Sequence, residues 1–396
     1  MLNSVGAAVV EARPQRRYTN GASGNGHHPN KGFAPVFTPA RVSEADEPTS
    51  PKKAQPKSIK QILSPVQSTL NLVEEQMRAV DSTLFQPLAT SFTDLIGSGG
   101  KRLRPALSLM AGEFSHKYAG RLPESPYHNN VILLAAAIET LHTSTLVHDD
   151  VIDGALIRRG APTLNAKWAM GTTILAGNFM FGHAAQFLAR TNNMRALNIF
   201  SNTLRVIVDG ELRQLFARND YTQDKDNYYH RIYAKTASLF CAATECAGVL
   251  TELPEPQVQQ LRDYGYNFGM AFQIIDDILD FTGNETTLGK PAGSDLRQGT
   301  LTLPFFYFLQ SHASPDALVD RLQRGMRLGY KGDVEGWNKI VEQTVGELCA
   351  SNAVTAARQE AVEFLQKAYD NMRCFPDNVY RQSLMDLCDV VAERTY

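Results

Sequence analysis

Two short acidic clusters, each embedded in an apolar run, constrain this sequence more than any other feature. They read Asp149-Asp150-x-x-Asp153 and Asp276-Asp277-x-x-Asp280. In a helix each residue turns by about 100°, so the first and last aspartates of a cluster lie about 40° apart on one face. The apolar flanks predict burial, and buried carboxylates are costly unless they are neutralised. Each cluster therefore predicts a bound cation.

Mg²⁺ fits these clusters because hard divalent ions prefer carboxylate oxygens. It usually takes one or two carboxylates from the protein, and water and substrate phosphates complete its shell. One such cluster alone is more often a solvated helix face or a helix cap. Two clusters in apolar helices, each followed by Gly and by Arg or Lys, favour several Mg²⁺ ions holding one diphosphate. They would form two walls of a single cavity.

The chain has helical periodicity from residue 58 almost to its end, and no segment alternates convincingly with period two. One amphipathic stripe consists of Val66, Leu70, Val73, Met77 and Val80. Further helices are predicted at 103–118, 128–150, 167–191, 193–217, 225–250, 255–282, 302–311, 315–327, 334–349, 352–371 and 379–393. Loops are predicted at 97–100, 154–162 and 283–302. We therefore expect an all-α fold with one domain over residues 58–396.

Residues 1–57 differ from the rest in composition. They are rich in Gly, Pro, Ser and Asn and have little apolar periodicity, which predicts a disordered N-terminal extension. Their basic residues outnumber their acidic ones, as in a mitochondrial transit peptide. We expect a cytoplasmic protein with a dispensable extension, and a mitochondrial one if the extension is a transit peptide.

Bulk composition excludes several classes of function. The net charge of −2, with no basic stripe, zinc spacing or P-loop, argues against nucleic-acid binding. The five cysteines have no close pair at metal-ligand spacing, which favours core thiols in a reducing compartment. The longest strongly apolar run, 131–138, is shorter than the roughly 18 residues of a membrane span. At most, peripheral contact with a membrane is expected.

Two cationic loops accompany the acidic clusters. Gly99-Gly100-Lys101-Arg102-Leu103-Arg104-Pro105 joins a glycine pair to three cations, and Arg158-Arg159-Gly160 follows the first cluster. Glycine lets the backbone approach an anion closely, Lys supplies a point charge, and Arg supplies a bidentate fork for phosphate. We infer two anion sites: one bridged by metal to aspartate, the other bound directly by Lys and Arg.

These motifs, in this order, resemble those of the trans-isoprenyl diphosphate synthases, and most closely the long-chain polyprenyl diphosphate synthases. The likeness covers residues 60–396. It also includes Leu141-His142-Thr143, Lys235-Thr236, Phe272-Gln273, Gly289-Lys290 and Asp295-Leu296. The resemblance implies an isoprenoid-synthase-type helical bundle around a deep central cavity, usually as a homodimer. It implies head-to-tail condensation of isopentenyl diphosphate with an allylic diphosphate, using three Mg²⁺ ions per active site.

The resemblance also implies roles for individual residues. The isopentenyl diphosphate ligands would be Lys101, Arg104, His142 and Arg159. The ligands of the allylic diphosphate or of the nascent cation would be Arg158, Lys235, Thr236, Gln273 and Lys290. The direct Mg²⁺ ligands would be Asp149, Asp153 and Asp276, supported by Asp150, Asp277 and Asp280. Glu211 and Gln214 resemble a polar stretch near the cavity, although a solvated helix face explains them equally well.

Product length would depend on the residues one turn before Asp149. In short-chain relatives bulky aromatics there stop growth, whereas this chain has Ser144 and Thr145. A product longer than geranylgeranyl diphosphate is expected, in the quinone side-chain range of about C30 to C50. Two departures from the family pattern are Thr300, where many relatives have Lys, and Asn178, where Asp is common. The first predicts weaker substrate binding rather than inactivity.

Three other functions fit all or part of the pattern. A geranylgeranyl or farnesyl diphosphate synthase shares all the motifs and differs in product length. A non-catalytic regulatory subunit of a heteromeric synthase tends to lose aspartates, whereas this chain keeps all six. A class I terpene cyclase has the first aspartate cluster, but it normally lacks the Gly-Gly-Lys-x-x-Arg sequence and the second cluster.

Overall fold

The computed structural model describes residues 57–79, 84–97, 100–158, 160–283 and 291–394. Residues 1–56, which make up almost all of the predicted N-terminal extension, lie outside the described residues. In the first half of the chain the helices are α1 (Ile59–Leu63), α2 (Gln67–Arg78), α3 (Gln86–Gly97), α4 (Leu103–Gly112), α5 (His128–Ile152), α6 (Leu164–Lys167), α7 (Met170–Ala189) and α8 (Met194–Phe216). Single turns of 3₁₀ helix lie at Ser64–Val66, Leu122–Glu124 and Met372–Cys374.

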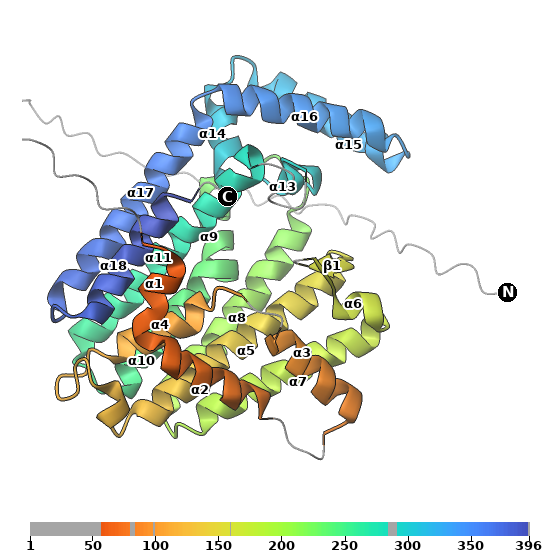
Figure 1. The fold of residues 1–396 in the computed structure, drawn as a ribbon. Helices are drawn as coiled ribbons and strands as arrows, with labels where there is room; N and C mark the ends of the chain where they lie inside the picture. The colour runs from red at the N-terminus through yellow and green to blue at the C-terminus, as the bar shows by residue number, and fades with distance from the viewer. Residues whose placement is uncertain (1–56, 80–83, 98–99, 159, 284–290, 395–396) are drawn as a thin grey trace, which may run out of the picture. The chain divides into compact units, whose positions relative to one another are not determined.

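The second half continues with helices. They are α9 (Lys225–Ile232), a π-helical turn η3 (Tyr233–Ala237), α10 (Ser238–Leu250), α11 (Glu255–Thr282), α13 (Ser294–Arg297), α14 (Leu303–Ser311), α15 (Pro315–Tyr330), α16 (Val334–Ala350), α17 (Ala353–Asn371) and α18 (Val379–Ala392). Two-residue strands β1 (Ile157–Arg158) and β2 (Ala161–Pro162) pair antiparallel. The described part of the chain is therefore all-α apart from this short ribbon, as predicted (Figure 1).

Helices α5 and α11 carry the two acidic clusters and form the centre of the bundle. Every residue of 131–141 is buried, and α5 packs against α2, α4, α7 and α10. Helix α11 packs against α10 and α17 in the same way, and Figure 1 shows both helices within the bundle. Each cluster lies in the last turns of its helix, or at its C-terminal cap in the case of Asp153. The bundle thus places both clusters at helix ends.

Averaged over 18 residues, α5 is apolar enough, and it is long enough, to cross a membrane. Its unbroken apolar run, 131–138, is much shorter than a membrane span. Of its most apolar 18-residue window, 78% is buried inside the protein. Core helices pass the same test, and the burial of α5 here is that of a core helix.

The predicted helix boundaries differ from the structure in two places that matter. The helix predicted at 103–118 ends at Gly112, and the chain turns there as Gly120 N–H donates to the Glu113 carbonyl (2.9 Å). The helix predicted at 225–250 contains the π-helical turn η3, which includes Lys235 and Thr236. A π-turn inserts an extra residue and re-aims the side chains around it, and such turns are frequent at functional sites.

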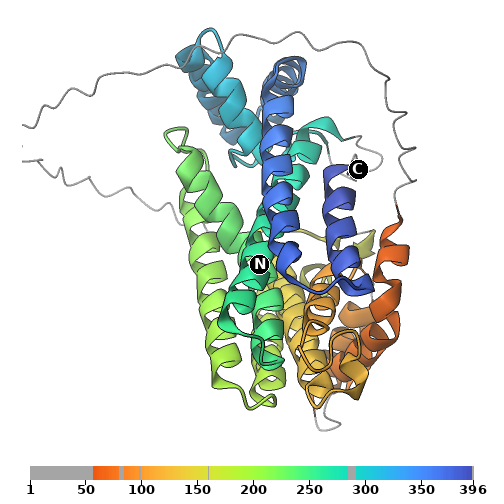
Figure 2. The same cartoon turned by 90° about the vertical axis from the view of Figure 1, so that its left-hand side faces the viewer.

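Helices α15 and α16 pack on each other as a pair that stands out from the bundle near α14 and α17 (Figures 1 and 2). Their inner faces contribute Leu318, Leu322, Val341 and Val345 to the core. The pair contacts α13 and α14 and does not line the cavity described next.

Candidate functional site

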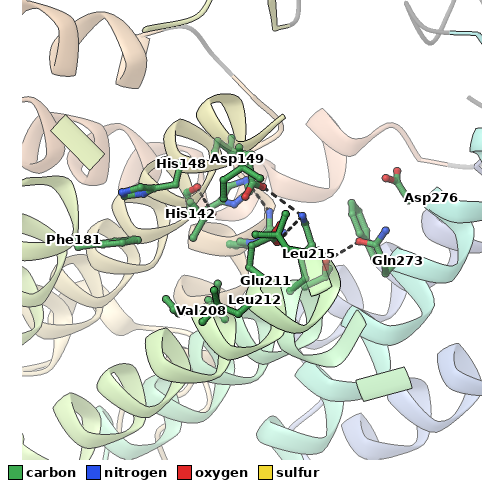
Figure 3. A pocket seen from close by; sticks show the side chains of 18 residues that line it. His142, His148, Asp149, Phe181, Val208, Glu211, Leu212, Leu215, Gln273 and Asp276 are labelled. Atoms are coloured by element: carbon green, nitrogen blue, oxygen red, sulfur yellow. Dashed lines mark hydrogen bonds and ion pairs between the residues drawn. The ribbon is translucent and has the colours of Figure 1, made fainter. Parts of the chain in front are cut away.

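A cavity of about 450 Å³ lies between the ends of α5, α8 and α11. We call it the apolar cavity because most of its exposed wall is apolar. It is lined from α5 by His142, Thr145, Leu146, His148, Asp149 and Ile152, from α8 by Ile207, Val208, Glu211, Leu212 and Leu215, and from α11 by Phe272, Gln273 and Asp276, together with Arg104, Phe181, Lys235 and Thr236. Figure 3 shows Asp149 and Asp276 on opposite sides of it, with Leu212 below.

A smaller polar cavity of about 140 Å³ adjoins the apolar one. Its lining is Asp153, Gln214, Arg231, Ile232, Lys235, Gln273, Asp277, Asp295, Gln298, Thr300 and Thr302. Lys235 and Gln273 line both cavities, so they lie at the boundary between them. Each cavity thus receives one aspartate from each acidic cluster, which confirms that the clusters are two walls of one site.

Asp149 and Lys235 meet at this boundary. Lys235 Nζ lies 2.9 Å from Glu211 Oε2 and 3.7 Å from Asp149 Oδ2 (Figure 3). Burial raises the pKa of Asp149 to about 6; Lys235 opposes the shift, whereas Glu211 adds to it. Burial alone would lower the pKa of Lys235, but Asp149 and Glu211 raise it above its ordinary value. Asp149 and Glu211 thus share the single ammonium of Lys235, and a further cation beside Asp149 would favour its ionised form.

The other two aspartates of the first cluster contact arginines. The Arg158 guanidinium donates to Asp150 Oδ1 at 2.8 Å, and this carboxylate is buried. Burial raises the pKa of Asp150, although Arg158 opposes the shift. Arg218 Nη2 donates to Asp153 Oδ1 at 2.9 Å. Asp150 is thus committed to an ion pair inside the protein, whereas Asp149 and Asp153 face the cavities.

The second cluster likewise has one aspartate that faces the apolar cavity and others that are buried and hydrogen-bonded inside the protein. Asp276 is half exposed and pairs with Arg394, whose Nη2 lies 3.2 Å from Asp276 Oδ1. Asp277 is buried and accepts hydrogen bonds from Tyr228 and Gln273; burial, followed by the charge of Asp295, raises its pKa above the ordinary value. Asp280 is buried and accepts the backbone N–H of Asp295 at 3.0 Å. Only the first aspartate of this cluster faces the apolar cavity.

The Gly-Gly-Lys-Arg-Leu-Arg-Pro stretch supplies two kinds of cation. Arg102 adopts φ 48°, and its side chain turns inward to the buried Glu139, with Nη1 2.7 Å from Oε1. Arg104 instead lines the apolar cavity, 3.2 Å from His142 Nε2 and over the Phe240 ring. Lys101 is exposed. Arg102 is therefore structural, and Arg104 and His142 form a second cationic position on the cavity wall.

Two predicted ligands, Arg159 and Lys290, lie outside the described residues. Thr236 and Gln273 are brought together at the boundary of the cavities, with the Thr236 hydroxyl 2.7 Å from Gln273 Oε1. Thr300 lines the polar cavity at the position where many relatives have Lys. Asn178 lies on α7, where its Oδ1 is 3.2 Å from His148 Nε2, so it contacts the residue before Asp149 rather than an aspartate.

The two predicted chain-length residues have different environments. Thr145 lines the apolar cavity. Ser144 is buried, and its hydroxyl donates to the Gly177 carbonyl of α7 at 2.8 Å. Neighbouring positions on a helix point about 100° apart, so only one of the two faces the cavity. From α7 the cavity wall receives Phe181, whereas Phe179 and His183 stack on each other and pack against Phe92.

The aspartates that face the cavities fit Mg²⁺ and not a metal that needs a closed cage. Asp149, Asp153 and Asp276 are partly exposed carboxylates, and each contacts a basic side chain of the protein. Among the described residues, no three His, Cys, Asp or Glu side chains lie close enough together to hold an ion by themselves. Mg²⁺ needs only one or two protein carboxylates when substrate phosphates and water complete its shell.

Sequence reasoning did not find three side chains that contact these aspartates. They are Arg218, Arg394 and Tyr228, which lie 65, 118 and 49 residues from their partners. Local spacing carries no information about such contacts. The apolar wall from α8 was also missed, although Val208, Leu212 and Leu215 recur at spacings of four and three, which is a helical signal.

Comparisons with known proteins agree with this geometry. The family model described as polyprenyl synthetase matches residues 85–329. The all-trans-nonaprenyl-diphosphate synthase (geranyl-diphosphate specific) of Rhodobacter capsulatus is 35% identical, over 84% of this chain and 97% of the relative. The heptaprenyl diphosphate synthase component 2 of Geobacillus stearothermophilus is 33% identical, over 85% of this chain and 99% of the relative.

A solved structure shows the same fold. The polyprenyl synthase from Caulobacter crescentus CB15, complexed with calcium and isoprenyl diphosphate, has a TM-score of 0.73 to this chain and 32% identity. The match covers 87% of this chain and all of that one. The all-α architecture expected from the sequence is therefore confirmed.

Proposed function

The chain belongs to the polyprenyl synthetase family, and from this premise we propose that it is a trans-polyprenyl diphosphate synthase that makes long products. It condenses isopentenyl diphosphate head to tail with an allylic diphosphate and repeats the step on its own product. The observation that carries the proposal is that Asp149 and Asp276, one from each acidic cluster, line a single cavity whose walls are otherwise mostly apolar. Diphosphate would bind at the charged end and the growing chain along the apolar wall.

The residues around the boundary of the cavities suit the chemistry of an allylic leaving group. Lys235 supplies a fixed positive charge for the departing diphosphate, and Arg158 supplies another close to Asp150. Such preorganised charges stabilise the transition state more than the ground state, because negative charge develops on the leaving group. The oxygens of Thr236 and Gln273 face the same place and would lie beside the carbon that becomes positive.

Asp149, Asp153 and Asp276 would hold Mg²⁺, and the neighbouring Asp150 and Asp277 would fix their helices through buried contacts. Bound Mg²⁺ would supply Lewis-acid stabilisation of the diphosphate charge. The Caulobacter relative is described as complexed with calcium and isoprenyl diphosphate, which supports the binding of a divalent cation together with a diphosphate. On the other side of the cavity, Arg104 and His142 would hold isopentenyl diphosphate.

A long product is supported by the relatives and by the wall of the cavity. Both curated relatives described above are named for long chains, heptaprenyl and nonaprenyl. One turn before Asp149 the wall carries Thr145, which is small, and α5 contributes no Phe, Tyr or Trp to the lining of the apolar cavity. Elongation would proceed between α5 and α8, where Val208 and Leu212 form an apolar face.

We further propose that the active form is a homodimer. Helices α7 and α8 expose large apolar side chains, including Leu175 (68%), Met194 (67%) and Phe216 (87%). Exposed apolar groups in such numbers mark contact surfaces. The name "component 2" of the Geobacillus relative favours a second candidate, a catalytic subunit that needs a different partner chain. The mass of the purified protein in solution, and its activity alone, separate the two assemblies.

Product analysis tests the proposed function. The purified protein is incubated with isopentenyl diphosphate, Mg²⁺ and geranyl, farnesyl or geranylgeranyl diphosphate, and the dephosphorylated products are measured by mass spectrometry. Products longer than C20 that vanish on chelation of Mg²⁺ are expected. A product of C20 or shorter would refute the long-chain assignment. Conversion of the allylic substrate without isopentenyl diphosphate would indicate a cyclase, and inactivity relieved by a partner chain would indicate a heteromeric subunit.

A further inference from the structure

A chain of three hydrogen bonds runs from a buried tyrosine to the boundary of the two cavities. The Tyr228 hydroxyl donates to Asp277 Oδ2 at 2.7 Å. The Gln273 amide donates through Nε2 to Asp277 Oδ1 at 2.8 Å. The Thr236 hydroxyl donates to Gln273 Oε1 at 2.7 Å. The chain thus joins α9, α11 and η3 through side chains alone.

These bonds determine which way the Gln273 amide points. A carboxylate only accepts hydrogen bonds, so the side of Gln273 that faces Asp277 must be its NH₂ group. Its carbonyl oxygen is then turned to Thr236 and the cavity boundary. Both distances, 2.7 Å from the Tyr228 hydroxyl to Oδ2 and 2.8 Å from Gln273 Nε2 to Oδ1, are those of a carboxylate that accepts at each of its oxygens.

Tyr228 holds Asp277 in place from the side away from the cavities. It is completely buried, belongs to the lining of neither cavity, and packs against Tyr229 and Phe306. The first turn of its helix is fixed by a capping box at Asp224. A side chain in this position cannot touch substrate. Its hydroxyl can act only through Asp277.

We propose that Tyr228 is a positioning residue, which holds Asp277 so that the Gln273 amide presents its carbonyl oxygen, together with the Thr236 hydroxyl, to the allylic carbon. This inference rests on the proposed function. An oxygen already aimed at the place where positive charge develops needs no reorganisation during the reaction, which is the condition for effective electrostatic stabilisation. Without the phenol hydroxyl, Asp277 can rotate, and Gln273 can then turn its NH₂ group toward the cavity, where it would repel the cation.

The conservative substitution Tyr228→Phe tests this directly. It keeps the ring contacts and removes one hydrogen bond. We expect kcat to fall about tenfold, the rate equivalent of a hydrogen bond to a charged group, while KM for both substrates stays within about twofold. The matched control is Tyr264→Phe on α11, which also removes a buried hydroxyl bond, to the Leu384 carbonyl at 2.9 Å. It should lower thermal stability without changing kcat.

Repeating Tyr228→Phe in a Gln273→Ala variant distinguishes a positioning role of Tyr228 from a purely structural one. In Gln273→Ala there is no amide left to orient, so adding Tyr228→Phe should reduce kcat by less than about twofold further. A tenfold further loss in the double variant would show that Tyr228 acts independently of Gln273 and would overturn the proposal. Equal kcat in wild type and Tyr228→Phe would overturn it as well.

Crystal structures of the wild-type protein and Tyr228→Phe provide a measurement that does not depend on turnover. The proposal requires the Asp277 carboxylate to rotate in the variant, or the distance from Gln273 Nε2 to Asp277 Oδ1 (2.8 Å in the wild type) to lengthen; an unchanged carboxylate and an unchanged distance would together refute it. A wild-type protein that is inactive with every starter would refute the proposed function instead. The structural comparison would then decide alone whether Tyr228 fixes Gln273.

Discussion

Arg394 Nη2 lies 3.2 Å from Asp276 Oδ1, although 118 residues separate the two in the sequence. The guanidinium also lies over the Phe272 ring, 4.8 Å from its centroid. The Arg394 side chain is mostly buried, and its Nε and Nη1 have no hydrogen-bond partner among the described residues. A protein cation thus neutralises the carboxylate that is expected to bind a metal ion.

Removal of this cation should strengthen metal binding. In Arg394→Ala, Mg²⁺ no longer competes with a guanidinium for Asp276, so the Mg²⁺ concentration for half-maximal activity should fall roughly two- to fivefold, the value of a partly exposed ion pair. A Mg²⁺ titration of initial rates measures it. Arg373→Ala is the control, because it removes an exposed ion pair with Asp370 and should leave the titration unchanged. A higher Mg²⁺ requirement in Arg394→Ala would contradict the competition.

Asp149 should be indispensable. Asp149→Ala removes a carboxylate that lines the apolar cavity beside Lys235, and turnover should fall by at least roughly 100-fold, as when one electrostatic stabiliser of a transition state is lost. Steady-state rates at saturating Mg²⁺ measure the effect. Asp377→Ala, which removes an exposed carboxylate far along the chain, should retain full activity. Turnover of Asp149→Ala within a few fold of wild type would exclude a metal role for this residue.

Much of the fold follows from local pattern. Apolar residues that recur at helical spacing form the buried surfaces of α5 and α11. The acidic clusters lie in the last turns of these helices, where the chain becomes polar. Burial of Leu70, Val73 and Met77 on α2 follows from the same period. Interactions within a few turns of helix carry this information.

The partners of the aspartates do not follow from local pattern. Arg218 meets Asp153 across 65 residues, and Tyr228 meets Asp277 across 49. Such contacts depend on how whole helices cross. The π-turn at Lys235 was likewise not predictable, since it interrupts a continuous apolar helix without glycine or proline. By contrast, helix geometry places Thr145, four residues before Asp149, about 40° from it and Ser144 about 140° away, so it does favour Thr145 as the residue that faces the cavity.

Glu113 should make stability depend on pH. It is buried at the end of α4, where its Oε2 accepts the Leu122 N–H at 2.9 Å, and burial raises its pKa to about 7 from the ordinary 4.5. The folded state therefore binds the proton more tightly than the unfolded state. The stability that this carboxyl contributes is fully present below pH 4.5 and is lost as the pH rises through about 7.

Glu113→Gln isolates this effect because a Gln carbonyl can still accept from Leu122 but cannot ionise. The melting temperature of the variant minus that of wild type should increase between pH 5 and pH 8. Subtracting the two melting temperatures removes the contribution of every other titrating group, because those groups are the same in both proteins. A difference that is constant over this range would show that Glu113 ionises in the folded state as readily as in the unfolded chain.

Gly177 should tolerate no side chain. A Cβ at this position of α7 would lie 2.3 Å from His148 Cε1. His148 precedes Asp149 and stacks on Phe181, so Gly177→Ala should displace it and cost about 1–3 kcal/mol in the free energy of unfolding. Gly182→Ala on the same helix is the control, since nothing lies within 4 Å of its Cβ; it should be neutral or stabilise by up to about 1 kcal/mol. Denaturant unfolding of both variants measures the difference.

Aromatic substitutions at Ser144 and Thr145, one helical turn before Asp149, should have different effects. Thr145→Phe places a ring in the apolar cavity below Asp149, so elongation should stop earlier and the product should become shorter by several isoprene units. Ser144→Phe instead drives a ring into α7, where the Ser144 hydroxyl contacts the Gly177 carbonyl. Overpacking of this kind costs about 1–3 kcal/mol, and we expect lower stability. Product mass spectra and melting temperatures of both variants measure these effects; a shorter product from Ser144→Phe with unchanged stability would place the floor of the cavity at α7 instead.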